Sequence, residues 1–150
     1  MAPDEGAALK LRAEDAEDLA VISACLQDAL VAVRDLAYAP EERNFLFVAN
    51  RFRWESGLRP APGEAPYERV LCGIMFSEVA AVSYSGFRRS DDGRILSLLA
   101  IRPENRAVHL EFSGGAAIRI EVARILCHAR DLGEPWPTPW QPRHDLDEVL

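Results

Sequence analysis

Arginine alternates with aromatic residues at positions 50–54, NRFRW, and this run has the clearest binding chemistry in the sequence. Guanidinium groups bind phosphate and carboxylate oxygens, and aromatic rings stack on bases, as in proteins that bind single strands of nucleic acid. On a strand, however, Arg51 and Arg53 would face one side and the aromatic residues the other, so no single surface could use both. We therefore keep the arginines, together with Arg88 and Arg89, as a candidate anion site.

A structural interpretation of the same run competes with the binding one. An amphipathic strand would place Phe52 and Trp54 in the core and leave the arginines at the surface. The chain has 17 basic and 24 acidic side chains, a net charge of −7. Because this charge opposes non-specific attraction to phosphates, we expect no nucleic-acid partner.

Residues capable of catalysis are present, but not in catalytic arrangements. Cys127 and His128 are adjacent, so on a strand they would point to opposite faces and could not act as nucleophile and base. The sequence contains no GxSxG, Walker or HExxH motif, and its three histidines and three cysteines lack metal-ligand spacing. We expect buried, reduced thiols, no metal, no cofactor and, on balance, no enzymatic activity. The alternative is a small enzyme with a site near the loop at residues 55–68.

The C-terminal segment, residues 133–150, is rich in proline and contains Trp136 and Trp140. Such a segment favours an extended, polyproline-like conformation. Two interpretations are open: the tryptophans dock on the sheet of the same chain, or the segment is a ligand for an aromatic groove elsewhere. Both tryptophans are therefore candidate binding residues.

Length and composition predict a single folded domain over residues 1–150, with 49% hydrophobic and 27% charged residues. No apolar run is long enough for a membrane span, and the start, MAPDEGAALK, lacks the basic-then-apolar order of a secretion signal. We expect a cytoplasmic protein without a membrane partner. A protein partner and self-association both remain open.

Hydrophobic periodicity separates a helical segment from a long β region. Residues 13–31 have apolar positions at helical spacing, with Asp15 as the N-cap, and residues 9–13 alternate as a short strand. Further strands are expected at 33–39, 44–54, 69–76, 79–87, 94–102, 107–113, 116–122 and 124–131. The pattern of the last of these, 124–131, fits a helix as well.

A similar phrase occurs twice, LAYAPEERNFLFV from position 36 and LAIRPENRAVHLEF from position 99. Both predict a strand, a Pro-Glu-x-Arg turn and a second strand. Four-residue loops would place Tyr38 opposite Phe45 and Ile101 opposite Val108. The two hairpins would then start two similar four-stranded meanders. Duplication and convergent turn chemistry both explain the repeat.

The hairpin around Gly114 and Gly115 has a register that alternation constrains. Apolar positions alternate on both sides, so opposed residues must share a face. We expect Phe112 opposite Ile118 and Glu111 opposite Arg119, joined by a loop with a left-handed glycine and a bulge.

Three segments, VRDLAYAPEERNFLFVANRFRWE, LEFSGGAAIRIEV and DLGEPW, resemble an uncharacterised family of short bacterial proteins, the domain-of-unknown-function family 2948. The resemblance covers nearly the whole chain and implies a stand-alone bacterial cytosolic protein. It carries over no catalytic or binding residue.

The sequence thus predicts an α+β fold with one N-terminal amphipathic helix packed on a mostly antiparallel sheet of eight to nine strands, barrel-like or two-layered. The function we expect is that of a small non-catalytic binding or assembly module. The alternatives are the small enzyme and the anion or nucleic-acid binder described above.

Overall fold

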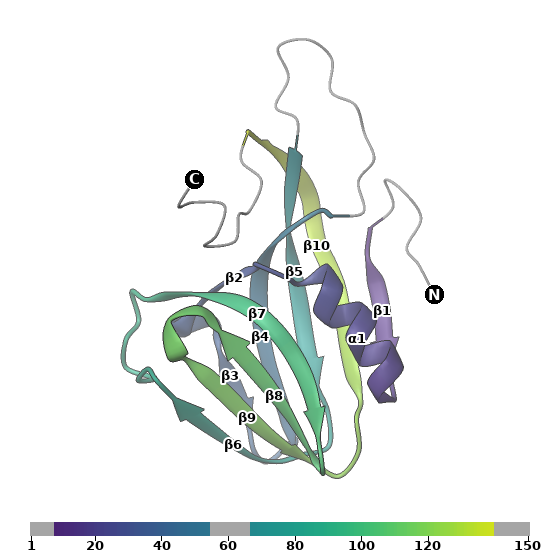
Figure 1. The fold of residues 1–150 in the computed structure, drawn as a ribbon, viewed down its shortest axis with the longest axis vertical. Helices are drawn as coiled ribbons and strands as arrows, with labels where there is room; N and C mark the ends of the chain where they lie inside the picture. The colour runs from purple at the N-terminus through teal and green to yellow at the C-terminus, as the bar shows by residue number, and fades with distance from the viewer. Residues whose placement is uncertain (1–7, 55–66, 140–150) are drawn as a thin grey trace.

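The computed structural model describes residues 8–54 and 67–139, and within them the chain forms one α-helix and ten strands (Figure 1). Short 3-10 turns occur at Val33–Asp35 and Ser113–Gly115. The larger elements, in chain order, are β1 (Lys10–Ala13), α1 (Ala16–Cys25), β2 (Leu30–Ala32), β3 (Ala37–Ala39), β4 (Asn44–Phe52), β5 (Tyr67–Phe76), β6 (Val79–Ser85), β7 (Ile95–Glu104), β8 (Ala107–Phe112), β9 (Ala117–Val122) and β10 (Cys127–Thr138).

All ten strands belong to one open antiparallel sheet. Its order is β1-β10-β5-β4-β2-β7-β8-β9-β6, and β3 pairs with β4 beside this path. The sheet folds over at β2, so that β6 to β9 form a layer in front of β3 and β4 (Figure 1). Buried side chains from both layers form one core. The predicted α+β class, with a helix on a mostly antiparallel sheet, is confirmed.

Helix α1 lies at the side of the two layers and packs against β1 and β7 (Figure 1). Its N-terminus is capped as predicted, because the Asp18 N–H donates to Oδ1 of Asp15 at 2.8 Å. Leu19 and Ile22 are buried in the core. The helix also holds β7, since Oγ of Ser23 accepts a hydrogen bond from the backbone N–H of Ile101 at 2.9 Å.

The helix is shorter than the expected 13–31, and the prediction for its second half is wrong. Asp28 has φ 63, a left-handed conformation that interrupts the helical geometry. Its N–H donates to the carbonyl of Leu98 at 2.7 Å, which brings the chain onto the sheet. The next residues form β2, which pairs with both β4 and β7 and so joins the two layers.

The two similar hairpins differ in their loops. Tyr38 lies opposite Phe45 as predicted, with a four-residue loop at positions 40–43. In the second hairpin Ile101 lies opposite Leu110 instead of Val108, because β7 continues through Pro103 and leaves a two-residue loop at 105–106. The expected equivalence of the two hairpins is therefore wrong.

The last hairpin is also displaced by two residues from the expected register. Leu110 lies opposite Ile118, and Glu111 opposite Ala117 instead of Arg119. The loop is Ser113–Gly115, with both glycines left-handed. Alternation is satisfied equally by two registers that differ by two residues, so it could not choose between them.

The expected pair of four-stranded meanders does not form, because the fourth strand of each is exchanged for that of the other. Strand β10 pairs with β5, next to β4 and β3, and strand β6 pairs with β9, next to β8 and β7. The segment expected at 124–131 is a strand, β10, that continues to Thr138. The strand expected at 33–39 begins only at Ala37.

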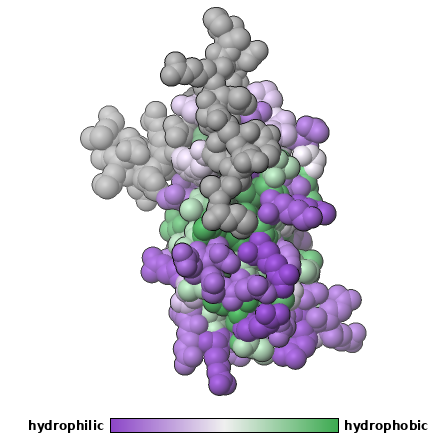
Figure 2. Space-filling model, turned by 90° about the vertical axis from the view of Figure 1, so that its right-hand side faces the viewer, coloured by the Kyte–Doolittle hydropathy of each residue, from purple (hydrophilic) through white to green (hydrophobic). Residues whose placement is uncertain are grey.

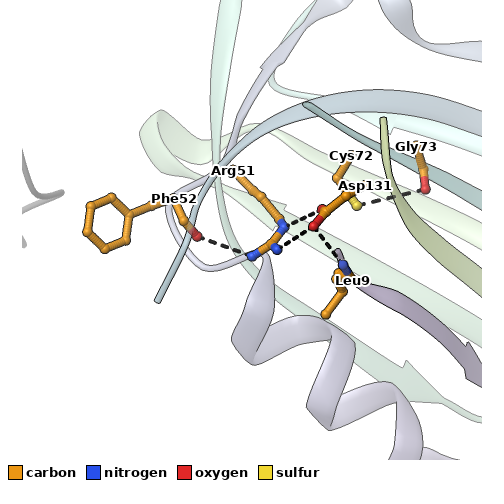
Figure 3. Close-up of polar contacts among 6 residues, drawn as sticks. All are labelled: Leu9, Arg51, Phe52, Cys72, Gly73 and Asp131. Atoms are coloured by element: carbon orange, nitrogen blue, oxygen red, sulfur yellow. Dashed lines mark hydrogen bonds and ion pairs between the residues drawn. The ribbon is translucent and has the colours of Figure 1, made fainter. Parts of the chain in front are cut away.

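A buried ion pair between Arg51 and Asp131 connects elements of the first layer, which is the part of the sheet formed by β1, β10, β5, β4 and β3 (Figure 3). Nε and Nη2 of Arg51 donate to the two carboxylate oxygens at 2.7 and 2.8 Å, and the side chains are 0% and 2% exposed. The same carboxylate accepts the backbone N–H of Leu9 at 2.8 Å. The pair therefore ties β4 to β10 and to the residue that precedes β1.

We predict that Asp131→Ala will destabilise the protein by about 3–5 kcal/mol, because it leaves the Arg51 charge buried without its carboxylate. The double variant Arg51→Met, Asp131→Leu should regain most of this loss, since two apolar side chains of similar size replace the pair. Urea unfolding gives the three free energies.

The ion pair of Arg102 and Glu111, 3.3 Å apart with side chains that are 65% and 32% exposed, provides a matched control. The corresponding substitutions there should cost less than about 1 kcal/mol. An Asp131→Ala loss no larger than that of the control would contradict the structural role of the buried pair.

Candidate functional site

The four candidate arginines do not share a surface. Arg51 is buried in its ion pair, and Arg53 is 4% exposed, with Nη1 donating to Glu68 at 2.6 Å. Arg89 donates to the carbonyl of Val33 at 3.0 Å, and only Arg88 and Arg89 are exposed. The expectation that Arg51 and Arg53 lie at the surface is wrong, because the odd-numbered positions of β4 face the core.

The aromatic residues of the same run are also partly internal. Phe52 is buried, and Trp54 packs against it with ring centroids 4.6 Å apart. Nε1 of Trp54 donates to the carbonyl of Gln27 at 3.0 Å. Residues of this run therefore pack on both faces of the strand.

Of the two candidate tryptophans of the C-terminal segment, Trp136 lies within the part of the chain that the structure describes. Trp136 lies on β10 opposite Arg69 and is 37% exposed. Trp140 lies outside the described residues. So does most of the loop at 55–68, where the alternative enzyme site was predicted.

The buried thiols are poor nucleophiles. Burial, with a smaller contribution from Asp131, raises the pKa of Cys72 to about 12, and burial also raises the pKa of Cys127. Cys127 faces the core while its neighbour His128 is only partly buried, so the two do not act as a pair. Within residues 8–54 and 67–139, no three histidine, cysteine or acidic side chains gather to hold a metal ion.

A groove lies on the outer face of the sheet, where β4, β5, β10 and β1 run side by side. One row across these strands is Val48, Gly73, Arg130 and Lys10. A hollow of about 400 Å³ lies over this row, and Gly73, which has no side chain, and Leu132 are among the residues that line it. We name this hollow the outer groove.

The outer groove has an apolar floor and a charged rim. Leu46, Val48 and Met75 contribute to the floor, and Lys10 and Arg130 are the cations that line it. Asp35 is the acidic residue among its lining residues. The groove thus combines apolar surface with a local excess of positive charge.

The apolar surface continues beyond the groove on the same face. Leu71 pairs with Leu132 and Asn50, and Leu30 also pairs with Asn50, so these side chains share the outer side. Leu71 and Leu30 are 41% and 38% exposed. The side of the molecule at α1 and β1, by contrast, is mixed, with apolar patches between hydrophilic side chains (Figure 2).

Gly73 is needed for the shape of the groove and not for its backbone conformation. Its φ lies outside the left-handed region, so an L-residue could occupy the position. A Cβ atom there would approach Cδ1 of Leu132 to 3.3 Å. A side chain at this position would therefore push against Leu132 and fill the hollow.

Sequence reasoning missed this groove, although the sequence contains a signal for it. The run FLFVA at positions 45–49 is apolar at consecutive positions, which is typical of a strand with apolar side chains on both faces. The alternation of the hairpin accounts only for the face that carries Phe45 and Phe47. The outward residues Leu46 and Val48 are the ones that the pattern indicates.

The fold and the groove define an α+β protein with an open, folded-over sheet and a surface suited to binding. The chain belongs to the family described as "Protein of unknown function (DUF2948)", whose model matches residues 9–144. The predicted family is thereby confirmed. Neither a curated protein nor a solved structure matches the chain. Among the residues that the structure describes, no helix has the length and hydrophobicity to cross a membrane.

We predict that thiol labelling of the native protein will modify Cys25 well before Cys72 and Cys127. Cys25 is half-buried, whereas the other two are buried with raised pKa values. A thiol with a pKa near 12 holds about one part in ten thousand as thiolate at pH 8, and this fraction rises about tenfold for each pH unit. Mass spectrometry of quenched samples gives the order.

Unfolding in urea is the control for thiol labelling, because it should make all three thiols react at similar rates. Equal labelling rates in the native protein would contradict the burial of Cys72 and Cys127.

Proposed function

We propose that the protein is a non-catalytic binding module of the cytoplasm that holds an acidic amphipathic segment of a partner protein in the outer groove. The observation that carries the proposal is an apolar groove with a cationic rim on a protein of net charge −7. The partner is thus defined by two properties, apolar side chains and acidic ones.

The apolar part of the proposal rests on the extent of the exposed surface. The groove floor, Leu71 and Leu30 belong to one face of the sheet, and they would be costly to leave in water. Contiguous apolar patches with polar rims are typical of interaction sites in soluble proteins. The outer groove therefore supports binding in preference to a purely structural face.

Two cations at the edge of the sheet define the charge that the partner must carry. Lys10 and Arg130 lie opposite each other on β1 and β10, at the rim of the groove. Acidic residues on a partner would complement these cations and fix its orientation. A basic partner would bring like charges together at this edge.

The shape of the groove favours a protein segment over a small molecule. Sites for small molecules enclose most of the ligand surface, whereas the outer groove is open along the sheet. An extended or helical segment can lie across the strands and still keep its polar side in water.

A peptide titration tests the proposal. Three short fluorescein-labelled peptides are compared, in which leucine alternates with glutamate, glutamine or lysine. We expect the glutamate peptide to bind with a Kd in the micromolar range, at least about tenfold tighter than the lysine peptide. Fluorescence anisotropy gives the affinities.

Two variants locate the binding. Gly73→Leu fills the groove and should weaken the glutamate peptide at least about tenfold, and Arg130→Glu should weaken it about fivefold. Ser83→Leu, at an exposed position of β6, is the matched control and should change nothing.

Equal binding of the three peptides, or unchanged binding to Gly73→Leu, would refute the proposal. Sedimentation of the protein alone covers one further outcome. A dimer that Gly73→Leu abolishes would assign the groove to a second copy of the chain in place of a partner segment.

A further inference from the structure

The two Pro-Glu-x-Arg turns end in arginines with the same unusual backbone conformation. Arg43 has φ 60 and Arg106 has φ 56, both in the left-handed region. Glycine and asparagine adopt this region more readily than arginine does. Turn geometry alone would therefore favour other residues at both positions, and an observed outlier of this kind points to a function.

The backbone brings the two turns to the same strand pair. The carbonyl of Arg43 accepts the N–H of Val79 at 2.8 Å, and the carbonyl of Arg106 accepts the N–H of Val122 at 3.0 Å. Val79 and Val122 lie opposite each other in the pairing of β6 with β9. Each turn is thus attached to one side of a single antiparallel pair, at one end of the molecule.

A second cavity, of about 580 Å³, lies between these turns, and we name it the turn cleft. Both turn arginines line it together with Arg119, and Glu121 is the acidic residue among its lining residues. The lining therefore has a charge of +2 on a protein whose net charge is −7. Asn105 adds an amide, and small side chains of Ala80 and Ala123 form part of the wall.

The turn arginines are available for a ligand, whereas the third arginine is already engaged. Arg119 forms ion pairs with Glu121 at 2.8 Å and with Glu104 at 3.5 Å. Among the residues that the structure describes, no acidic group forms an ion pair with Arg43 or Arg106, and both residues are exposed.

We propose that the turn cleft binds a small hydroxylated molecule through a phosphate monoester group. Two exposed guanidinium groups that line one cleft match the charge of a phosphoryl group, to which each can donate paired hydrogen bonds. Glu121 accepts and Asn105 donates or accepts hydrogen bonds, so both can hold hydroxyl groups of the same ligand.

The same lining argues for a small ligand and against a nucleic-acid chain. Glu121 repels additional phosphates, and Glu41 and Glu42 precede Arg43 in its turn. A long polyanion would bring several phosphates near these carboxylates, whereas a single phosphoryl group brings only one. The turn cleft is independent of the outer groove, because different elements form it.

An NMR titration of the intact protein tests this assignment. Glycerol 3-phosphate should shift the backbone signals of Asn105, Arg106 and Ala123 with saturation at a Kd of about 1 mM or tighter. Glycerol should cause no shift, and inorganic phosphate should bind more weakly by a few-fold because it lacks the hydroxyl groups.

Variants separate the ligand role from the role in the turn. Arg43→Gly and Arg106→Gly remove the guanidinium but accept the left-handed backbone, so each should bind glycerol 3-phosphate at least about fivefold more weakly without a lower Tm. Arg102→Gln, at an exposed arginine outside the cleft, is the matched control and should bind as the unmodified protein does.

Three outcomes would overturn the proposal. The first is unchanged binding by both glycine variants. The second is an equal loss in the Arg102→Gln control, which would mean that the ligand binds exposed arginines without a site. The third is tighter binding of a single-stranded oligonucleotide than of glycerol 3-phosphate, which would assign the arginines to a nucleic-acid backbone.

Discussion

The ion pair between Arg51 and Asp131 is the interaction on which the arrangement of the first layer depends. Two full charges lie in the core. Removal of either partner would leave the other charge buried and unpaired, which destabilises the fold far more than the loss of an apolar contact does. Asp131 also binds the backbone of Leu9, which makes the position of β1 conditional on the same carboxylate. An edge strand of four residues has few other contacts to fix it, and here its start is specified by a charge from β10.

The inward direction of Asp131 determines what the outer face can be. Successive side chains of a strand alternate, so with Asp131 in the core, Arg130 and Leu132 must point outward. The neighbours in register, Gly73 and Leu71, follow the same rule. A shift of β10 by one residue would bury Arg130 and expose the carboxylate. The register of β10 that pairs Asp131 with Arg51 in the core is therefore the same register that places Arg130 and Leu132 in the outer groove.

Features that depend on residues close together in the sequence were predictable from it, whereas features that depend on distant residues were not. The cap at Asp15, the first hairpin and the α+β class belong to the first group. Registers failed where alternation allowed two solutions, as for Leu110 opposite Ile118. The burial of Arg51 could not be predicted, because its partner lies 80 residues away in the chain. The turn arginines were visible in the repeated phrase, but only the strand pairing showed that they meet at one cleft.

The exchange of β6 and β10 between the two halves also has a consequence for the order in which the chain can fold during synthesis. Strand β10 is the last strand of the described chain, yet it lies between β1, the first, and β5. Until it leaves the ribosome, β5 has one open hydrogen-bonding edge and β1 has no strand partner. The sheet around β5 and β1 therefore remains incomplete, with an unpaired strand edge, until β10 has been synthesised. During that time the open edge of β5 is available to pair with a strand of another chain.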